Sequence, residues 1–286
     1  MPDTPDWMTR GESRAPVDLK TDRPHAARVY DVLLGGKTNY EPDRAMAAQV
    51  VANVPTAQPT ARANRDFMLR ATRYLAAEAG VRQFLDIGTG IPTQPNLHEA
   101  AQSVAPDSRV VYVDNDPIVL AHSRALHTSD PAGRTAYIDA DASDPDGILA
   151  SALLRETLDL DRPVALSMCL LLHWLPATAD PYAVVRRLVD ELVPGSFLVI
   201  THLARDLDQD GVGGLESDFE SSGSQLQGRT KDEVLGFFDG LSLIEPGLVV
   251  PHMWRPEPVA VDIGSADMRV DEHRAPIWAG VAAKKD

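Results

Sequence analysis

Three acidic residues of this chain stand directly after short apolar runs. Asp86 follows "FL" in "RQFLDIGTGIPTQ", Asp114 ends "RVVYVD", and Asp141 follows "YIDA". Just beyond the first acid, Gly88 and Gly90 let the backbone turn sharply and approach a ligand without a Cβ in the way. A carboxylate at such a turn repels a pyrophosphate and attracts an ammonium or another cationic centre. The pattern therefore predicts a site for a positively charged nucleoside without phosphates.

The glycine turn departs from the dinucleotide-binding fingerprint. Thr93 stands where a third glycine would allow close packing of the helix on the strand. S-adenosylmethionine has an adenosine, a cationic sulfur and no phosphate, so it suits the turn better than NAD does. We expect Asp114 to accept hydrogen bonds from both ribose hydroxyls and Asp141 to accept one from the adenine amino group. Each acid alone could be a solvated turn residue, but the three together favour the cofactor site.

Two further segments could meet a methyl acceptor. His173 in "CLLLHWLP" could act as a general base near neutral pH, or could simply pack beside Trp174 and bond to backbone. In "RVYDVLLGGKTNY", Tyr30 and Asn39 lie on either side of Gly35–Gly36. We predict that this segment is a lid and that Tyr30, Asn39 and His173 line the acceptor cavity. The alternative is a capped helix pair that packs on the sheet edge, with the glycines as C-caps. Further residues that could face the cleft are Arg65, His202 and Trp254.

The elements that must position these residues alternate along the chain. Strand-like segments at 83–88, 109–114, 136–141, 163–172 and 196–203 are separated by helix-like segments at 96–105, 117–127, 148–158 and 180–193. Such alternation predicts right-handed βαβ crossovers, and the nearly continuous apolar strands agree with a parallel sheet covered on both faces. In such a sheet, ligands bind beyond the carboxyl ends of the strands, where the strand order reverses.

The segments outside this alternation extend the fold at both ends. A short helix over 26–33, a helix opened by Pro42 and a longer helix from Thr60 to Gly80 precede the first strand. After the fifth strand, 204–228 is a loop or a poorly ordered helix, 231–240 a helix, 241–251 a strand and 275–285 a closing strand. We predict an α/β fold: a Rossmann-like, doubly wound, mostly parallel seven-stranded sheet with an N-terminal helical extension. The predicted organisation is a mobile arm at 1–24, a helical lid at 25–80 and the core at 81–286.

Composition excludes several classes of protein. The net charge of −15 argues against nonspecific nucleic-acid binding, and no apolar run is long enough to span a membrane. The eight histidines show no paired spacing typical of a metal site, so we expect no metal. A single cysteine, Cys169, allows no intramolecular disulfide and suits a cytoplasmic protein. The oligomeric state stays open.

The order "FLDIGTG", "VVYVDNDP", "YIDADAS", "ALSMCLLLHWL", "SFLVITHL" resembles a class I S-adenosylmethionine-dependent methyltransferase. More narrowly, "ARVYDVLLGGKTNYEPDR" resembles an actinobacterial group of proposed methyltransferases long described as a domain of unknown function. The resemblance implies that Asp86, Gly88 and Gly90 line the methionine end of the cofactor and Asp114 the ribose. It likewise implies that Asn115 lies at the adenine face and that Asp141 and Ala142 lie at the adenine edge. The predicted cofactor-binding residues also include Thr89 and Ser167.

Three classes of function follow. The first is a methyltransferase that uses S-adenosylmethionine on a small-molecule acceptor. The second is a non-catalytic sensor or partner protein that binds S-adenosylmethionine or S-adenosylhomocysteine. The third, a dinucleotide oxidoreductase, is disfavoured by Thr93 and Asp86.

Overall fold

A seven-stranded sheet organises the part of the protein that the computed structural model describes, residues 19–119, 129–175, 177–256 and 275–285. The strands are β1 (Gln83–Ile87), β2 (Arg109–Asp114), β3 (Arg134–Asp139), β4 (Ala165–Cys169), β5 (Phe197–Leu203), β6 (Ser242–Leu243) and β7 (Ile277–Ala283). Their order is β3-β2-β1-β4-β5-β7-β6; β1 to β5 run parallel, and β7 and β6 are antiparallel to their neighbours. The order reverses between β1 and β4, which confirms the predicted doubly wound, Rossmann-like fold.

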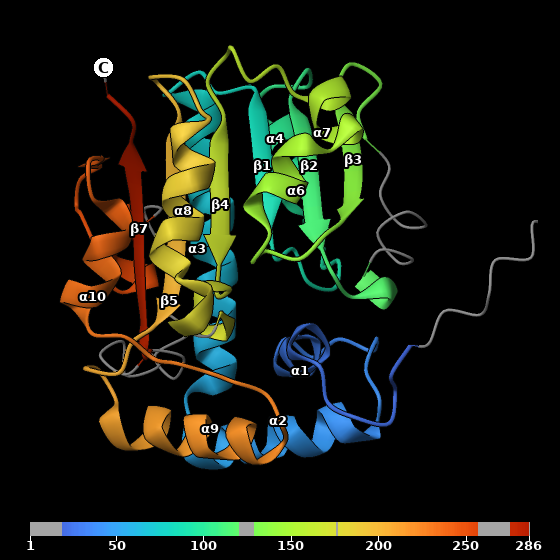
Figure 1. Ribbon diagram of the computed structural model, residues 1–286, viewed down its shortest axis with the longest axis vertical. Coiled ribbons are helices and arrows are strands. Elements are labelled where there is room, and N and C mark those ends of the chain that lie inside the picture. Colours follow the sequence, from blue (N-terminus) through green and yellow to red (C-terminus); the bar gives the residue numbers. More distant parts are fainter. Residues whose placement is uncertain (1–18, 120–128, 176, 257–274, 286) are drawn as a thin grey trace, which may run out of the picture.

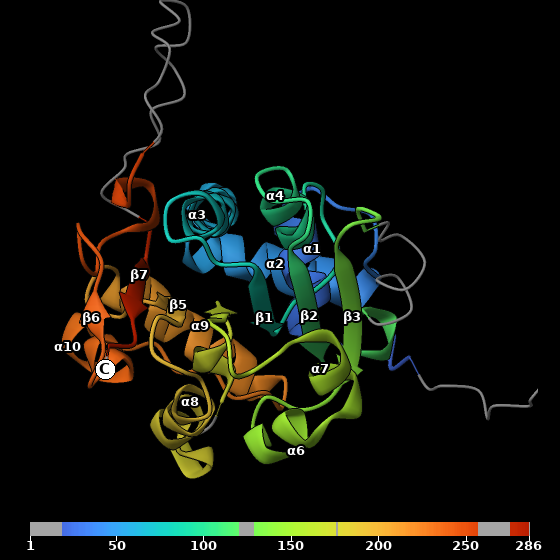
Figure 2. The ribbon, with the colours of Figure 1, turned by 90° about the horizontal axis from the view of Figure 1, so that it is seen from above.

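Helices cover both faces of the sheet (Figure 2). One face carries α3 (Ala57–Ala77) and α4 (Leu97–Gln102); the other carries α6 (Pro145–Ala150), α7 (Ala152–Thr157) and α8 (Pro181–Asp190). Each face has its own apolar core, with Phe84 and Val110 in the first and Leu85 and Val111 in the second. Because successive side chains of a strand point to opposite faces, a parallel sheet covered on both sides needs apolar residues at nearly every position.

Three helices lie across the carboxyl ends of the strands: α1 (Ala26–Leu33), α2 (Glu41–Asn53) and α9 (Gln209–Ser221) (Figure 1). They share a third apolar cluster, in which Val29 and Val50 pack with Leu215 and Phe219. Gly214 brings α9 close to α2, because a Cβ there would lie 2.6 Å from Oδ1 of Asn53. We call these three helices the cap.

A buried ion pair anchors the N-terminal part of the cap. Arg28 and Asp43 are almost fully buried, with 3.3 Å between Nε and Oδ1. Arg28 also donates to the carbonyls of Leu19, Lys20 and Arg23, so these residues of the predicted arm are tied to α1. Residues 1–18 of that arm lie outside the described residues.

The polar segment at 204–228, predicted to be a loop or a poorly ordered helix, contains the helix α9. Asp208 caps this helix by accepting from the backbone N–H of Gly211, and Val212, Leu215 and Phe219 form its buried face. Glycine there serves close helix packing and does not mark a loop.

Other boundaries differ from the predictions. The helix expected over 148–158 breaks at Ser151, whose backbone is extended, into α6 and α7. The fourth strand ends at Cys169, because Leu170 has a φ of +49° and leaves the sheet. The strand expected over 241–251 pairs as a strand only at Ser242–Leu243, with a separate bridge from Val249 to Ala279. Part of the helix expected over 117–127 lies outside the described residues.

The remaining described elements are short. They are α10 (Lys231–Leu235) and the 3₁₀ helices η2 (Leu172–Trp174), η3 (Ala177–Ala179), η4 (Gly236–Phe238) and η5 (Pro251–Met253). Within the described part of the chain, no helix is both long and apolar enough to cross a membrane.

Candidate functional site

A cavity of about 570 Å³ lies between the carboxyl ends of the strands and the cap. One half borders the glycine turn after β1 and the ends of β2 and β3. Of the predicted site residues, ten line the cavity: Tyr30, Asp86, Gly88, Thr89, Gly90, Asp114, Asn115, Asp141, Ala142 and His173. Ser167 and Asn39 do not. The topology therefore gathers residues that are more than a hundred positions apart in the chain.

The glycine turn has the close approach and the open space that the sequence predicted. Gly88 has a φ of +76°, and a Cβ there would lie 2.7 Å from Cδ1 of Leu171. Gly90 has a φ of +69°, and a Cβ there would meet no atom within 4 Å. Both conformations favour glycine. The first glycine lets the loop after β4 pack against the turn, and the second leaves room beside it.

Asp86 is held from the neighbouring strand. The hydroxyl of Ser167 donates to Oδ1 at 2.5 Å, and the hydroxyl of Thr89 donates to Oδ2 at 3.2 Å. Asp86 and Ser167 are register partners on β1 and β4, which explains how the pair forms. Burial raises the pKa of Asp86 above its usual value, although the two hydroxyls oppose the shift. Ser167, predicted to bind cofactor, thus orients a cavity carboxylate and does not itself line the cavity.

Asp114 organises the backbone around the turn. Its Oδ2 accepts from the backbone N–H of Gly90 at 2.9 Å, and its Oδ1 accepts from that of Asp116 at 2.9 Å. Burial raises the pKa of the Asp114 carboxyl above its usual value. The same carboxylate therefore shapes the loop and borders the cavity.

Asn115 and Asp141 form a pair at the far side of this half of the cavity. The Asn115 amide donates to Oδ2 of Asp141 at 3.0 Å, and Oδ1 of Asp141 accepts from the backbone and the hydroxyl of Ser143. Burial alone would raise the pKa of Asp141, but the bonds from Ser143 and Asn115 outweigh it and lower that pKa.

Arg65 brings a positive charge to the same half. It lines the cavity from α3, donates to the carbonyls of Thr93 and Pro95, and attracts the Asp86 carboxylate. Its Nε is enclosed without a hydrogen-bond partner among the described residues. Sequence analysis could not assign it a role, because one arginine in a helical segment is usually a solvated residue. The two other residues predicted as possible cleft residues, His202 and Trp254, are fully buried and do not line the cavity.

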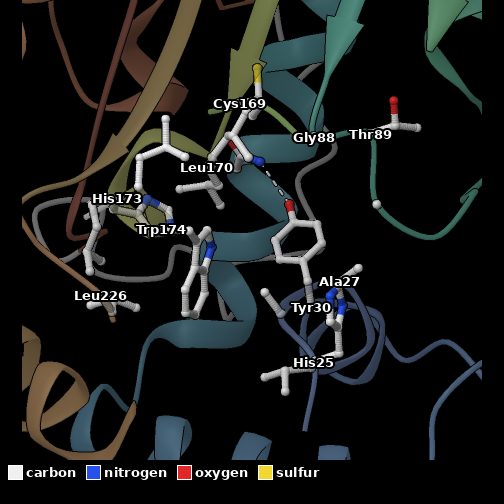
Figure 3. A pocket seen from close by; sticks show the side chains of 18 of the residues that line it. His25, Ala27, Tyr30, Gly88, Thr89, Cys169, Leu170, His173, Trp174 and Leu226 are labelled. Carbon is white, nitrogen blue, oxygen red and sulfur yellow. Dashed lines mark hydrogen bonds between the residues drawn. The ribbon is translucent and has the colours of Figure 1, made fainter. Parts of the chain in front are cut away.

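The other half of the cavity lies beneath the cap, and we call it the apolar chamber. Its walls include Val29, Val50, Trp174, Leu203, Leu215 and Phe219. Figure 3 shows Tyr30, Trp174 and His173 around this space.

Tyr30 enters the chamber from α1 and is hydrogen-bonded to α3. Its hydroxyl donates to the carbonyl of Ala61 at 2.9 Å and accepts from the Asn64 amide at 2.8 Å. Oδ1 of Asn64 in turn accepts from the Thr201 hydroxyl at 2.6 Å. Burial raises the pKa of Tyr30 to about 12, so its hydroxyl stays protonated at neutral pH.

His173 reaches the cavity from η2, just after the left-handed residue Leu170. The turn is held by two hydrogen bonds from the backbone N–H of Leu170 to Thr201, at 3.0 Å to its carbonyl and 2.9 Å to its hydroxyl. The His173 ring lies 5.2 Å from that of Trp174 and 5.5 Å from that of His202, between centroids. Its Nδ1 is enclosed and has no hydrogen-bond partner among the described residues. Burial lowers the pKa of His173 well below its usual value, and the nearby His202 and Arg229 lower it further.

The structure does not bring Asn39 to the cavity. Its amide donates to Oδ2 of Asp31 at 2.9 Å and to the carbonyl of Gly36, and its oxygen accepts from Arg44. Asn39 closes the loop between α1 and α2. In the described part of the chain, no group of three or more His, Cys, Asp and Glu side chains could hold a metal ion.

Comparison with known proteins agrees with this geometry. A family model described as S-adenosyl methyltransferase matches residues 12–285. A DUF574 family protein from Streptomyces avermitilis is 45% identical, with a TM-score of 0.87 over 93% of this chain and 100% of that one. A "putative methyltransferase" from Thermobifida fusca is 40% identical, with a TM-score of 0.84 over 96% of this chain and 100% of that one. No curated protein matches the chain.

The matched region includes the glycine turn, the three strand-end acids and the whole cap. The predicted resemblance and cofactor are confirmed: the protein is a member of the S-adenosyl methyltransferase family, and S-adenosylmethionine is its cofactor.

Proposed function

We propose that the protein transfers a methyl group from S-adenosylmethionine to a small-molecule acceptor that binds in the apolar chamber. The observation that carries this proposal is the continuity of the cavity, which joins a charged half at the strand ends to an apolar half beneath the cap. Its volume of about 570 Å³ is typical of a site for small molecules, which roughly spans 300–1,000 Å³. Two ligands placed in the two halves would meet where the glycine turn faces the loop after β4.

The charged half fits the cofactor. Asp86 suits the ammonium and Arg65 the carboxylate of its methionine portion, because an acid and a guanidinium lie at the same turn. Asp114 borders the space for the ribose, and Asn115 with Asp141 the space for the adenine. The open space beside Gly90 lets the ligand approach the backbone closely. When bound, the cofactor supplies a methyl group on a positively charged sulfur.

The protein's own contribution is to position the acceptor and to exclude water from the reacting atoms. Holding an acceptor in line with the methyl carbon turns a bimolecular reaction into a nearly unimolecular one. The apolar walls of the chamber and the cap above it keep bulk water away from the reacting atoms. The alternative of a non-catalytic sensor lacks such support, because it gives the apolar chamber no occupant.

Calorimetric titration with S-adenosylmethionine, S-adenosylhomocysteine and NAD tests this proposal. We expect both sulfur nucleosides to bind and NAD not to, because Asp86 would face its pyrophosphate. Asp141→Ala should weaken binding by about tenfold or more, since a hydrogen bond to a charged group contributes about 1.5–3 kcal/mol. Asp139→Ala is the matched control: it ends β3, is exposed and does not line the cavity. Tighter binding of NAD than of either sulfur nucleoside would rule the proposal out.

A further inference from the structure

We propose that the acceptor is an uncharged, largely apolar hydroxyl compound with a flat ring, which binds in the apolar chamber with its hydroxyl beside His173. This inference rests on the proposed function and adds the chemical class of the substrate. Its evidence is the distribution of charge, hydrogen bonds and rings around the cavity.

Charge is confined to one half of the cavity. Among the described residues that line it, the side chains with a formal charge at neutral pH are Arg65, Asp86, Asp114 and Asp141. Asp86 lies near the end of β1, Asp114 ends β2 and Asp141 follows β3. Arg65 bonds to the turn after β1. A charged acceptor in the chamber would therefore lose its hydration without gaining a counter-ion, which costs several kcal/mol. The chamber selects against carboxylates, phosphates and ammonium groups.

Most polar groups near the chamber already have partners. The chain of hydrogen bonds from Thr201 through Asn64 and Tyr30 to the carbonyl of Ala61 uses these side chains internally. Of the enclosed polar atoms in the cavity wall, Nδ1 of His173, the hydroxyl of Thr60 and Nε of Arg65 lack a hydrogen-bond partner among the described residues, whereas Nδ1 of His25 lies 3.0 Å from Oδ2 of Asp116. An acceptor with many polar groups would leave most of them unpaired, whereas one with a single hydroxyl needs one partner.

Aromatic side chains stand among the aliphatic ones that line the chamber. Trp174 packs edge-on against Phe219, with 4.8 Å between centroids and 83° between planes, and Tyr30 enters from α1. Figure 3 shows the rings of Tyr30 and Trp174 beside this space. Aromatic pairs prefer offset-stacked or edge-to-face contacts, so a flat ring fits these walls better than a branched aliphatic molecule does.

The chemistry of the step balances with these groups. The acceptor oxygen forms a bond to the methyl carbon as the carbon–sulfur bond breaks, and that bond's electron pair stays on the sulfur. The hydroxyl proton passes to the neutral imidazole of His173, so one positive charge moves from sulfur to imidazole. Burial keeps His173 neutral at the start and makes it a weaker base, so we expect the proton to move only as the new oxygen–carbon bond makes the hydroxyl more acidic.

Three probes with one ring skeleton test the substrate class. The protein is first loaded with S-adenosylhomocysteine and is then titrated with 2-naphthol, 2-naphthoate and 2-naphthylmethylammonium. We expect 2-naphthol to bind and the two charged probes to bind at least about tenfold more weakly, because neither finds a counter-ion. Failure of S-adenosylhomocysteine to bind would contradict the proposed function. If it binds and 2-naphthol does not, or if a charged probe binds equally well, the inference on the acceptor is wrong.

A substitution that fills the chamber tests where the probe binds. Leu215→Trp places a larger side chain in the wall and should abolish 2-naphthol binding while S-adenosylhomocysteine still binds, which also shows that the variant folds. Leu153→Trp is the matched control, since Leu153 is exposed on α7 and does not line the cavity. Unchanged 2-naphthol binding to a folded Leu215→Trp protein would place the probe elsewhere. Should this variant not fold, the three probes on the parent chain still decide the proposal.

A third measurement tests His173. With S-adenosylmethionine and 2-naphthol, the parent protein should form 2-methoxynaphthalene, and His173→Gln should form it about 10²- to 10⁴-fold more slowly. The variant should still bind 2-naphthol, because the side-chain oxygen of glutamine can accept the hydrogen bond from the hydroxyl; its affinity is measured separately, and the two rates are compared at saturating 2-naphthol. Absence of product from the parent would contradict the hydroxyl assignment, and an unchanged rate in the variant would contradict the role of His173.

Discussion

Two carboxylates that line the cavity have a raised pKa because they are desolvated: Asp86 is buried and Asp114 is partly buried. Their hydrogen bonds come from hydroxyls and backbone N–H groups, which hold each carboxylate in place without neutralising it. Desolvated charges held in this way are a common feature of binding sites, where the ligand supplies the missing partner.

Asp86→Asn should therefore stabilise the protein without ligand and weaken cofactor binding. Because the pKa of Asp86 is raised in the folded chain, the folded state binds more protons than the unfolded state between the usual and the raised pKa. The contribution of Asp86 to stability thus falls as pH rises through that window, and at pH 7 the charged form is a burden. Asparagine removes that charge, and its amide can donate to the oxygens of Ser167 and Thr89.

Thermal unfolding of parent and variant between pH 4 and pH 8 measures this effect. We expect the variant to have the higher midpoint at pH 7 and the difference to shrink as the pH approaches 4. Titration with S-adenosylmethionine should show at least about tenfold weaker binding. A lower midpoint of the variant at pH 7 would mean that the hydrogen bonds to the Asp86 carboxylate outweigh the cost of burying its charge.

Among the elements, the cap forms the wall of the cavity that faces the strand ends. The segment around the glycine pair after α1 was predicted to be a lid, and the structure shows a tightly bonded loop there. Gly36 has no room for a Cβ, because that atom would overlap the Asp31 carboxylate, which accepts from Thr38 and Asn39. Gly35 has a φ of +80° and no neighbour within 4 Å of a Cβ. The two glycines therefore have different roles, and whether the loop acts as a lid stays a prediction.

Hydrogen exchange across residues 26–40 tests the lid. We expect exchange to slow by about tenfold or more when S-adenosylhomocysteine is added, because closure protects amides that otherwise open locally. Gly36→Val should displace Asp31, remove most of this protection and weaken binding. Gly35→Asn is the matched control, since asparagine tolerates a positive φ. Equal exchange with and without ligand would identify the segment as a fixed wall.

For the whole molecule, cofactor binding should appear as stability. A ligand that binds only the folded state at 100 times its Kd adds about 2.7 kcal/mol. For a chain of this size, each kcal/mol moves the thermal midpoint by about 2–4 °C, so we expect a rise of roughly 5–10 °C. Differential scanning fluorimetry with S-adenosylhomocysteine measures it, with NAD at the same concentration as the control. Equal shifts with S-adenosylhomocysteine and NAD would argue against a selective site.

The fold was predictable from local patterns. Apolar runs such as "RVVYVD", separated by helical spacing, determine a parallel sheet almost by themselves, because both faces of its strands must be buried. Since the carboxyl ends of parallel strands share one edge, the glycine turn and the acids Asp86, Asp114 and Asp141 had to gather there. The charged half of the cavity followed from the sequence for that reason.

Several contacts in the charged half, and the whole apolar chamber, depended on tertiary structure. Neighbouring positions do not reveal that Ser167 orients Asp86, that Arg65 reaches the turn after β1, or that Asn39 faces Asp31 and not the cavity. Helix α9 was ambiguous because its glycines resemble those of a loop until Asn53 of α2 is placed against them. The apolar chamber is assembled from helices and loops far apart in the chain, so only their packing decided its shape, its neutrality and the place of His173 in its wall.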